Sequence, residues 1–218
     1  GNRIAFTSDR AGGASIYWQS ADGSGTAERI SDGSMPQLPS SFTPDASQLV
    51  FQQPLLLPLD IGVITVDGRQ AVMLLETPYS EYSAEVSPDG KWIAYESDES
   101  RGREVYVSPF PAMETSRRQV TTDGGSRPLW SRDGTELFYH VAPDTIMAVP
   151  VQLGARLTLG RPEVAYQGPY ASVVDANSVE RHYDVSRDGQ RFLLLSEDED
   201  AAVVPAEIIV VLNWQEEL

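Results

Sequence analysis

The chain has 218 residues with 41% hydrophobic and 22% charged side chains, and its net charge is −16. This composition is typical of a soluble globular protein, and the acidity argues against binding to nucleic acid or to anionic membranes, since both attract basic surfaces. No apolar stretch is long enough to insert across a bilayer, and without a cysteine the chain forms no disulfide.

A short turn phrase occurs four times along the chain, each time followed by an apolar run. The four copies are Phe42–Asp45, Val86–Gly90, Trp130–Gly134 and Val185–Gly189. Their aspartates follow one another at intervals of 44, 44 and 55 residues. A repeat of this length built from strands is typical of a β-propeller, in which each blade buries its faces against its neighbours.

In chain order, the repeat predicts five blades in one domain, over residues 1–33, 34–77, 78–123, 124–168 and 169–218. The inner, second, third and outer strands of the third blade are expected at Tyr82–Ser87, Lys91–Ser97, Arg103–Ser108 and Arg117–Thr122. Other third strands are expected at Ser15–Trp18, Ile61–Val66, Thr145–Val151 and Glu207–Leu212. Other outer strands are expected at Ala27–Ser31, Ala71–Glu76 and Pro162–Gln167.

The first and last blades are predicted to be incomplete. Asn2–Ser8 matches the second strand of the third blade, so the first blade lacks its innermost strand, and the last blade ends at its third strand. Closed propellers usually complete one blade from both chain ends, which removes exposed strand edges. Either further blades of a longer protein supply the missing pieces, giving six or more, or the chain forms a five-bladed ring with an incomplete blade. Association through the incomplete blades is also open.

The expected fold class is therefore all-β: a β-propeller of four-stranded antiparallel blades, about five of them visible, with the first and last incomplete. The aspartates of the phrase are interpreted as turn formers, because Asp bonds nearby backbone N–H groups and the following Gly supplies the positive φ of the turn. We expect no metal at these aspartates.

The third repeat carries a family resemblance. Ser87–Gly90, followed by Lys91–Asp98 and then Glu104–Val107, resembles the blade repeat of TolB-type propellers, and the resemblance extends over nearly the whole chain. Over a shorter span, Ile208–Leu218 resembles the end of propeller domains appended to bacterial eukaryotic-like serine/threonine kinases. The resemblance implies a non-catalytic binding or sensor module without cofactor, which takes a protein or peptide ligand at the funnel of the ring. It also favours a periplasmic or extracytoplasmic location.

The inner strands line the central channel, so their first residues surround its mouth. The residues expected there are Tyr82, Ser83, Arg127, Arg181, His182 and Tyr183. Guanidinium groups bind carboxylates with two parallel bonds, so this cluster is a candidate site for a small acidic ligand or an acidic peptide. The alternative is that these side chains hydrate the channel and bond between blades.

Two segments depart from the repeat. Leu55, Leu56 and Leu57 make one connection apolar, which indicates either a partner surface or a loop folded over the adjacent blade. The last repeat carries an insertion at Tyr170–Val179, which is either a lid over the ring or a tolerated surface loop.

Motifs of enzymes are absent from the sequence: it has no Gly-x-Ser-x-Gly, no cysteine nucleophile, no phosphate-binding Gly-rich loop and no His-Glu-x-x-His. Of its two histidines, His140 is expected to pack within a strand and His182 to lie at the channel mouth. The sequence therefore favours a binding module. The alternative is a propeller hydrolase of the lactonase kind or the substrate-gating propeller of a serine peptidase.

Overall fold

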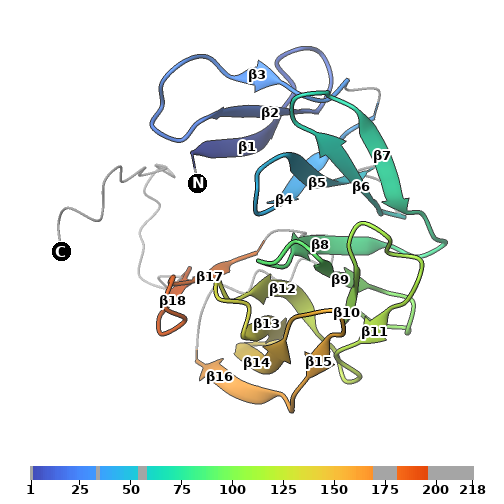
Figure 1. The fold of residues 1–218 in the computed structure, drawn as a ribbon, viewed down its shortest axis with the longest axis vertical. Coiled ribbons are helices and arrows are strands. Elements are labelled where there is room, and N and C mark those ends of the chain that lie inside the picture. The colour runs from blue at the N-terminus through green and yellow to red at the C-terminus, as the bar shows by residue number, and fades with distance from the viewer. Residues whose placement is uncertain (1, 33–34, 54–57, 169–180, 196–218) are drawn as a thin grey trace, which may run out of the picture.

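Five antiparallel sheets follow one another around a common centre in the computed structural model, which describes residues 2–32, 35–53, 58–168 and 181–195 (Figure 1). The first sheet contains β1 (Arg3–Ser8), β2 (Ser15–Ser20) and β3 (Glu28–Arg29). The second contains β4 (Leu38–Phe42), β5 (Gln48–Gln53), β6 (Asp60–Thr65) and β7 (Ala71–Leu75). The third contains β8 (Glu81–Val86), β9 (Trp92–Ser97), β10 (Glu104–Pro109) and β11 (Arg118–Gln119).

The fourth sheet contains β12 (Ser126–Trp130), β13 (Glu136–Val141), β14 (Thr145–Gln152), β15 (Thr158–Leu159) and β16 (Glu163–Gln167), and the fifth contains β17 (Tyr183–Val185) and β18 (Phe192–Leu194). The strands β4, β8, β12 and β17 lie nearest the centre, and β1 is an edge strand of its sheet (Figure 1). The expected all-β propeller of about five blades is confirmed. The strand expected at 207–212 lies outside the described residues.

The fourth sheet differs from the prediction, because two short strands pair with the outer edge of β14 rather than one. The first half of β14 pairs with β16, and its last two residues, Val151 and Gln152, pair with β15. At eight residues, β14 is longer than the other strands, so it offers room for both partners. The outer strands β3 and β11 are shorter than expected, at two residues each.

The repeated turn is built as the sequence predicts. In the fourth sheet Asp133 Oδ1 accepts hydrogen bonds from Ser131 Oγ at 2.7 Å and from the Thr135 amide at 3.0 Å, and Gly134 takes a φ of 73°. The equivalent carboxylates make the same pair of bonds in the second, third and fifth sheets. The phrase therefore closes each inner hairpin.

The core consists of apolar clusters between consecutive sheets. Side chains alternate along each second strand. In β5, Leu49 and Phe51 therefore pack against the first sheet and Val50 packs against the third. All three are at most 1% exposed. Burial on both faces fixes the order of the sheets around the centre.

Candidate functional site

The inner strands begin with a backbone irregularity that decides where the predicted mouth residues lie. The pairing of β4, β8 and β12 with their second strands shifts register near the start of each inner strand. In β8 and β12 the shift coincides with left-handed residues, Ser83 with φ of 50° and Arg127 with φ of 54°. Such bulges turn the amide of the bulged residue out of its own ladder.

A side chain from the preceding sheet accepts a hydrogen bond from each of these amides. Gln52 Oε1 accepts from the Ser83 amide at 3.2 Å, and Glu96 Oε1 accepts from the Arg127 amide at 2.6 Å. Gln52 and Glu96 occupy equivalent positions in β5 and β9. These bonds tie each inner strand to the second strand of the sheet before it.

Four of the predicted mouth residues lie in the walls between sheets. Tyr82 is 4% exposed, and the Arg103 guanidinium lies 4.2 Å from the centre of its ring. Arg127 is 5% exposed, and its carbonyl accepts a hydrogen bond from the Tyr183 hydroxyl at 2.6 Å. Ser83, Arg127 and Tyr183 thus take part in hydrogen bonds between neighbouring sheets, as in the alternative interpretation of the cluster. The ring contact of Tyr82 lies within the third sheet.

His182 lies near His140 and Arg127. His140 is buried and its Nδ1 lies 3.1 Å from Ser126 Oγ. Burial lowers the pKa of His140, and the charges of Arg127 and His182 lower it further. Arg127 and His182 thus both lie close enough to His140 for their charges to act on it.

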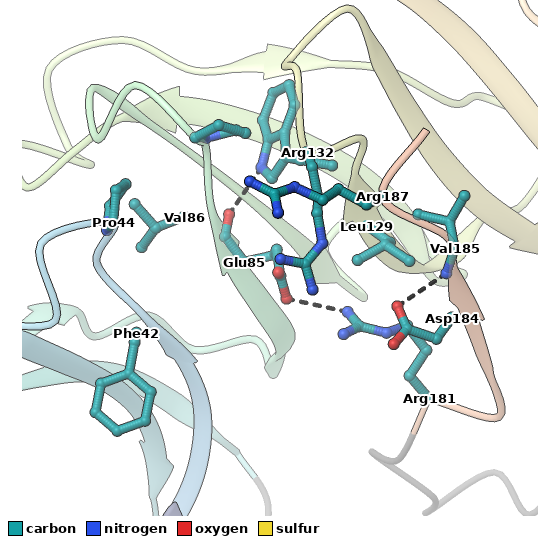
Figure 2. A pocket seen from close by; sticks show the side chains of 12 residues that line it. Phe42, Pro44, Glu85, Val86, Leu129, Arg132, Arg181, Asp184, Val185 and Arg187 are labelled. Carbon is teal, nitrogen blue, oxygen red and sulfur yellow. Dashed lines mark hydrogen bonds and ion pairs between the residues drawn. The ribbon is translucent and has the colours of Figure 1, made fainter. Parts of the chain in front are cut away.

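Arg181 turns from the start of the fifth sheet into a pocket on the ring axis (Figure 2). Its guanidinium lies 3.0 Å from Glu85 Oε2 and donates to the Pro128 carbonyl at 3.2 Å. Because only about a quarter of either side chain is exposed, the ion pair is shielded from water and anchors the fifth sheet to the third.

The pocket has a volume of about 520 Å³ and lies among the inner strands and their turns. Its walls come from four sheets: Phe42, Pro44, Glu85, Val86, Pro88, Leu129, Trp130, Arg132, Arg181, Asp184, Val185 and Arg187. The Trp130 indole closes one wall by donating to the Glu85 carbonyl at 2.9 Å. Seven of these twelve residues are apolar and five are charged, so the pocket surface combines both kinds of side chain.

Two further arginines give the pocket its charge. Arg132 and Arg187 are exposed, and their side chains extend over the pocket toward Glu85 (Figure 2). Within the described residues, neither guanidinium forms a hydrogen bond or an ion pair, whereas Arg181 is paired with Glu85. Three arginines face the two carboxylates of Glu85 and Asp184 there, a local excess of positive charge in a chain of net charge −16.

Arg132 and Arg187 are not among the site residues predicted from the sequence, although the sequence holds a signal for them. Both occupy the position just before the turn aspartate, where the second and third repeats carry Pro44 and Pro88. Proline is the residue that the turn itself favours there. Arginine at that position in two repeats therefore points to a role outside the turn.

Two segments singled out in the sequence are not tested by the structure. Leu55, Leu56 and Leu57 and the insertion at 170–179 lie outside the described residues. Over the part of the chain that the structure describes, no group of three or more His, Cys, Asp or Glu side chains is arranged to hold a metal ion. The same residues include no helix long and apolar enough to cross a membrane.

Solved structures share this fold. TolB from Acinetobacter baumannii is 20% identical with a TM-score of 0.69, and the match covers 91% of this chain and 47% of that chain. A protein described as TolB from Agrobacterium tumefaciens is 18% identical with a TM-score of 0.59, and the match covers 77% of this chain and 64% of that one. An oligogalacturonate lyase in complex with manganese is 10% identical with a TM-score of 0.57, and the match covers 92% of this chain and 69% of the lyase.

The chain thus spans less than two thirds of the two TolB structures. No protein-family model and no curated protein sequence matches it. At these identities the structural likeness concerns the fold alone. On that evidence, the chain folds as a TolB-like β-propeller.

Proposed function

We propose that this propeller is a non-catalytic interaction module whose axial pocket binds an acidic segment of a partner protein. The observation that carries the proposal is the pair of exposed guanidinium groups, Arg132 and Arg187, which extend over the pocket without a carboxylate of their own among the described residues. Arginine is suited to this role because its planar donors bind carboxylates in pairs.

The pocket wall supports a peptide as the ligand. Phe42 is half-buried at the pocket wall and can offer apolar surface beside the charged groups, and an extended peptide presents carboxylates and apolar side chains on alternate sides. Arg181 contributes less to binding, because Glu85 already neutralises it. An extracytoplasmic location and attachment to a kinase stay hypotheses that follow from the sequence resemblance.

Replacing Arg132 or Arg187 with Ala is expected to weaken binding of an acidic peptide about tenfold each, because each substitution removes a charge-assisted contact of roughly 1.5 kcal/mol. Fluorescence anisotropy of a labelled Glu–Gly repeat peptide would measure this, with a Lys–Gly peptide as the ligand control. Affinity is also expected to fall as salt is added, since the contacts lie at an exposed rim.

Arg161→Ala is the matched control variant, because Arg161 is an exposed arginine in the loop between β15 and β16, outside the pocket lining. It should bind the acidic peptide like the unaltered protein. Equal affinity of Arg132→Ala, Arg187→Ala and the control would contradict the proposal.

A second candidate function is a propeller lyase or hydrolase, which the likeness to the manganese-bound lyase favours. Such an enzyme needs ligands for a divalent cation on the axis, and the described residues hold no such group. Isothermal titration calorimetry with Mn²⁺ distinguishes the interaction module from the enzyme, because stoichiometric binding of the metal would favour the enzyme.

A further inference from the structure

Seven aspartates of this chain are followed directly by a glycine. Such a pair can react with itself, because the glycine amide nitrogen can attack the aspartate side-chain carboxyl and close an imide ring. Glycine permits this approach, since it has no Cβ and few conformational restrictions. The carboxyl must be protonated so that its oxygen can leave as water, and the amide nitrogen must turn toward it. The hydrogen bonds that each pair makes therefore control its reactivity.

Six of the seven pairs lie within the described residues, and in five of these the glycine amide donates a hydrogen bond. The five donors, with distances of 2.8 to 3.1 Å to their acceptors, are Gly23, Gly90, Gly124, Gly134 and Gly189. The aspartate carboxylates of the same five pairs also accept hydrogen bonds. Both reacting groups are thus held by other partners.

The pair Asp67–Gly68 differs from the other five. It lies exposed in the turn between β6 and β7. Neither the Asp67 carboxylate nor the Gly68 amide forms a hydrogen bond with any described residue. The flanking residues close the turn instead: the Arg69 amide donates to the Thr65 carbonyl at 2.8 Å, and the Thr65 amide donates to the Gln70 carbonyl at 2.9 Å.

The first sheet carries a matched pair at the same place of the repeat. Asp22–Gly23 follows β2 as Asp67–Gly68 follows β6, and both pairs are exposed. The amides just before them, of Ala21 and Val66, each donate at 2.9 Å to the carbonyl of the residue that precedes the second strand of the sheet. The two turns therefore enter the pair in the same way.

Hydrogen bonds distinguish the two matched pairs. The Gly23 amide donates to the Ser20 carbonyl at 3.1 Å, and Asp22 Oδ1 accepts from the Ser24 amide at 2.9 Å. Hydrogen bonds from the side chain and the backbone of Ser24 lower the pKa of Asp22 and so keep its carboxyl ionised. An ionised carboxylate has no hydroxyl to lose as water, so it is a poor target for the amide nitrogen.

We propose that Asp67–Gly68 is a modification site of the folded protein, at which Asp67 converts spontaneously to isoaspartate while the equivalent Asp22 is protected. In the first step Gly68 N forms a bond to Asp67 Cγ, and the amide hydrogen leaves with the carboxyl hydroxyl as water. A second water molecule then cleaves the bond between the Asp67 main-chain carbonyl carbon and Gly68 N. That carbonyl carbon becomes a free carboxylate, and the main chain now runs through Cγ. Water alone takes part, and the mass of the chain is unchanged.

The modification changes the turn itself, because the main chain between Asp67 and Gly68 gains the Cβ methylene group. The next residue, Arg69, lies 3.5 Å from Glu28 of β3 and so connects this turn to the first sheet. Neither Asp67 nor Gly68 lines the axial pocket. The proposal is therefore independent of the ligand assigned to that pocket.

Peptide mapping of protein aged at mildly acidic pH tests the assignment. Electron-transfer fragmentation distinguishes isoaspartate from aspartate in peptides of equal mass, so one sample gives the rate at every pair. The same chain unfolded in urea gives the rate of each pair without folded structure. In the folded protein, Asp67 should isomerise at close to its unfolded rate. Asp22, Asp133 and Asp188 should be slowed about tenfold or more by folding, since their hydrogen bonds must break before reaction.

Two results would overturn the proposal. If folding slows Asp67 as much as it slows Asp22, the turn between β6 and β7 does not present a reactive pair. If folding leaves Asp22 as reactive as Asp67, the hydrogen bonds of the first sheet give no protection. Because both pairs are measured in the same folded molecules, differences in temperature, pH or ageing time cannot produce either result.

Discussion

Replacing Glu96 with Leu is expected to destabilise the protein by about 3 to 5 kcal/mol, the cost typical of breaking a buried charged pair. Glu96 is fully buried, accepts the Arg127 amide at 2.6 Å and lies 3.5 Å from the Arg103 guanidinium. Leu removes the acceptor of the bulge amide and the charge that faces Arg103. For a domain of this size the loss lowers the melting temperature by roughly 10 °C, which calorimetry would measure.

Glu96→Gln is the matched control. At the equivalent position of the second sheet, Gln52 already accepts a hydrogen bond from the backbone amide of Ser83 in the third sheet. The amide oxygen of Gln can replace the carboxylate at the bulge, and the substitution loses only the charge opposite Arg103. We expect a small loss of stability for Gln and a large one for Leu. A Leu variant as stable as the Gln variant would show that these bonds between sheets contribute little.

Glu81 is expected to make the protein less stable as the pH rises from 5 to 8. Its side chain is fully buried; Oε1 accepts from Thr77 Oγ1 at 2.8 Å, and Oε2 has no hydrogen-bond partner among the described residues. Burial, together with smaller contributions from the charges of Asp60 and Asp98, raises the pKa of Glu81 from 4.5 to about 7. The folded protein therefore holds this proton more tightly than the unfolded chain does.

The sign of the effect follows from that difference in pKa. The stability that the protonated Glu81 side chain contributes is fully present below pH 4.5 and is lost as the pH rises to about 7. The total loss in the free energy of unfolding is about 3 kcal/mol. Glu81→Gln removes the titrating group, so its stability relative to the unaltered protein should rise by about 2 to 3 kcal/mol between pH 5 and pH 8.

Urea unfolding of both proteins at the two pH values measures this shift. Glu163→Gln, at an exposed position of β16, is the control and should show no such change. Hydrogen bonds to the turn aspartates lower the pKa of Asp45, Asp133 and Asp188, so their contribution is lost only at more acidic pH, outside this window. A constant difference between Glu81→Gln and the unaltered protein would contradict the assignment.

The sequence predicts the architecture well because the repeated phrase encodes it locally. Serine or threonine, aspartate and, in three of the four copies, glycine make the same turn each time, and the apolar alternation after the turn fixes which sheet each side chain faces. Outer strands are harder to predict, because β3 and β11 have only two residues each and are set by pairing with β2 and β10.

The candidate site was only partly predictable, because backbone conformation decides which side chains reach the axis. The residue types of Ser83 and Arg127 do not predict a left-handed bulge. That bulge nevertheless places both residues in the wall between sheets. Arg181 was expected at the mouth but turns inward to Glu85, a contact between residues 96 apart in sequence. Arg132 and Arg187 can be recognised as pocket residues only from the structure, because the turns that carry them meet around the pocket.

The most direct test of the account is to observe the arginine side-chain N–H signals by NMR while an acidic Glu–Gly peptide is added. If the axial pocket is the binding site, the signals of Arg132 and Arg187 shift and saturate together, the signal of Arg181 shifts less, and that of Arg161 does not move. If the signals of Arg132 and Arg187 stay unchanged while the peptide binds, the ligand site lies elsewhere on the propeller.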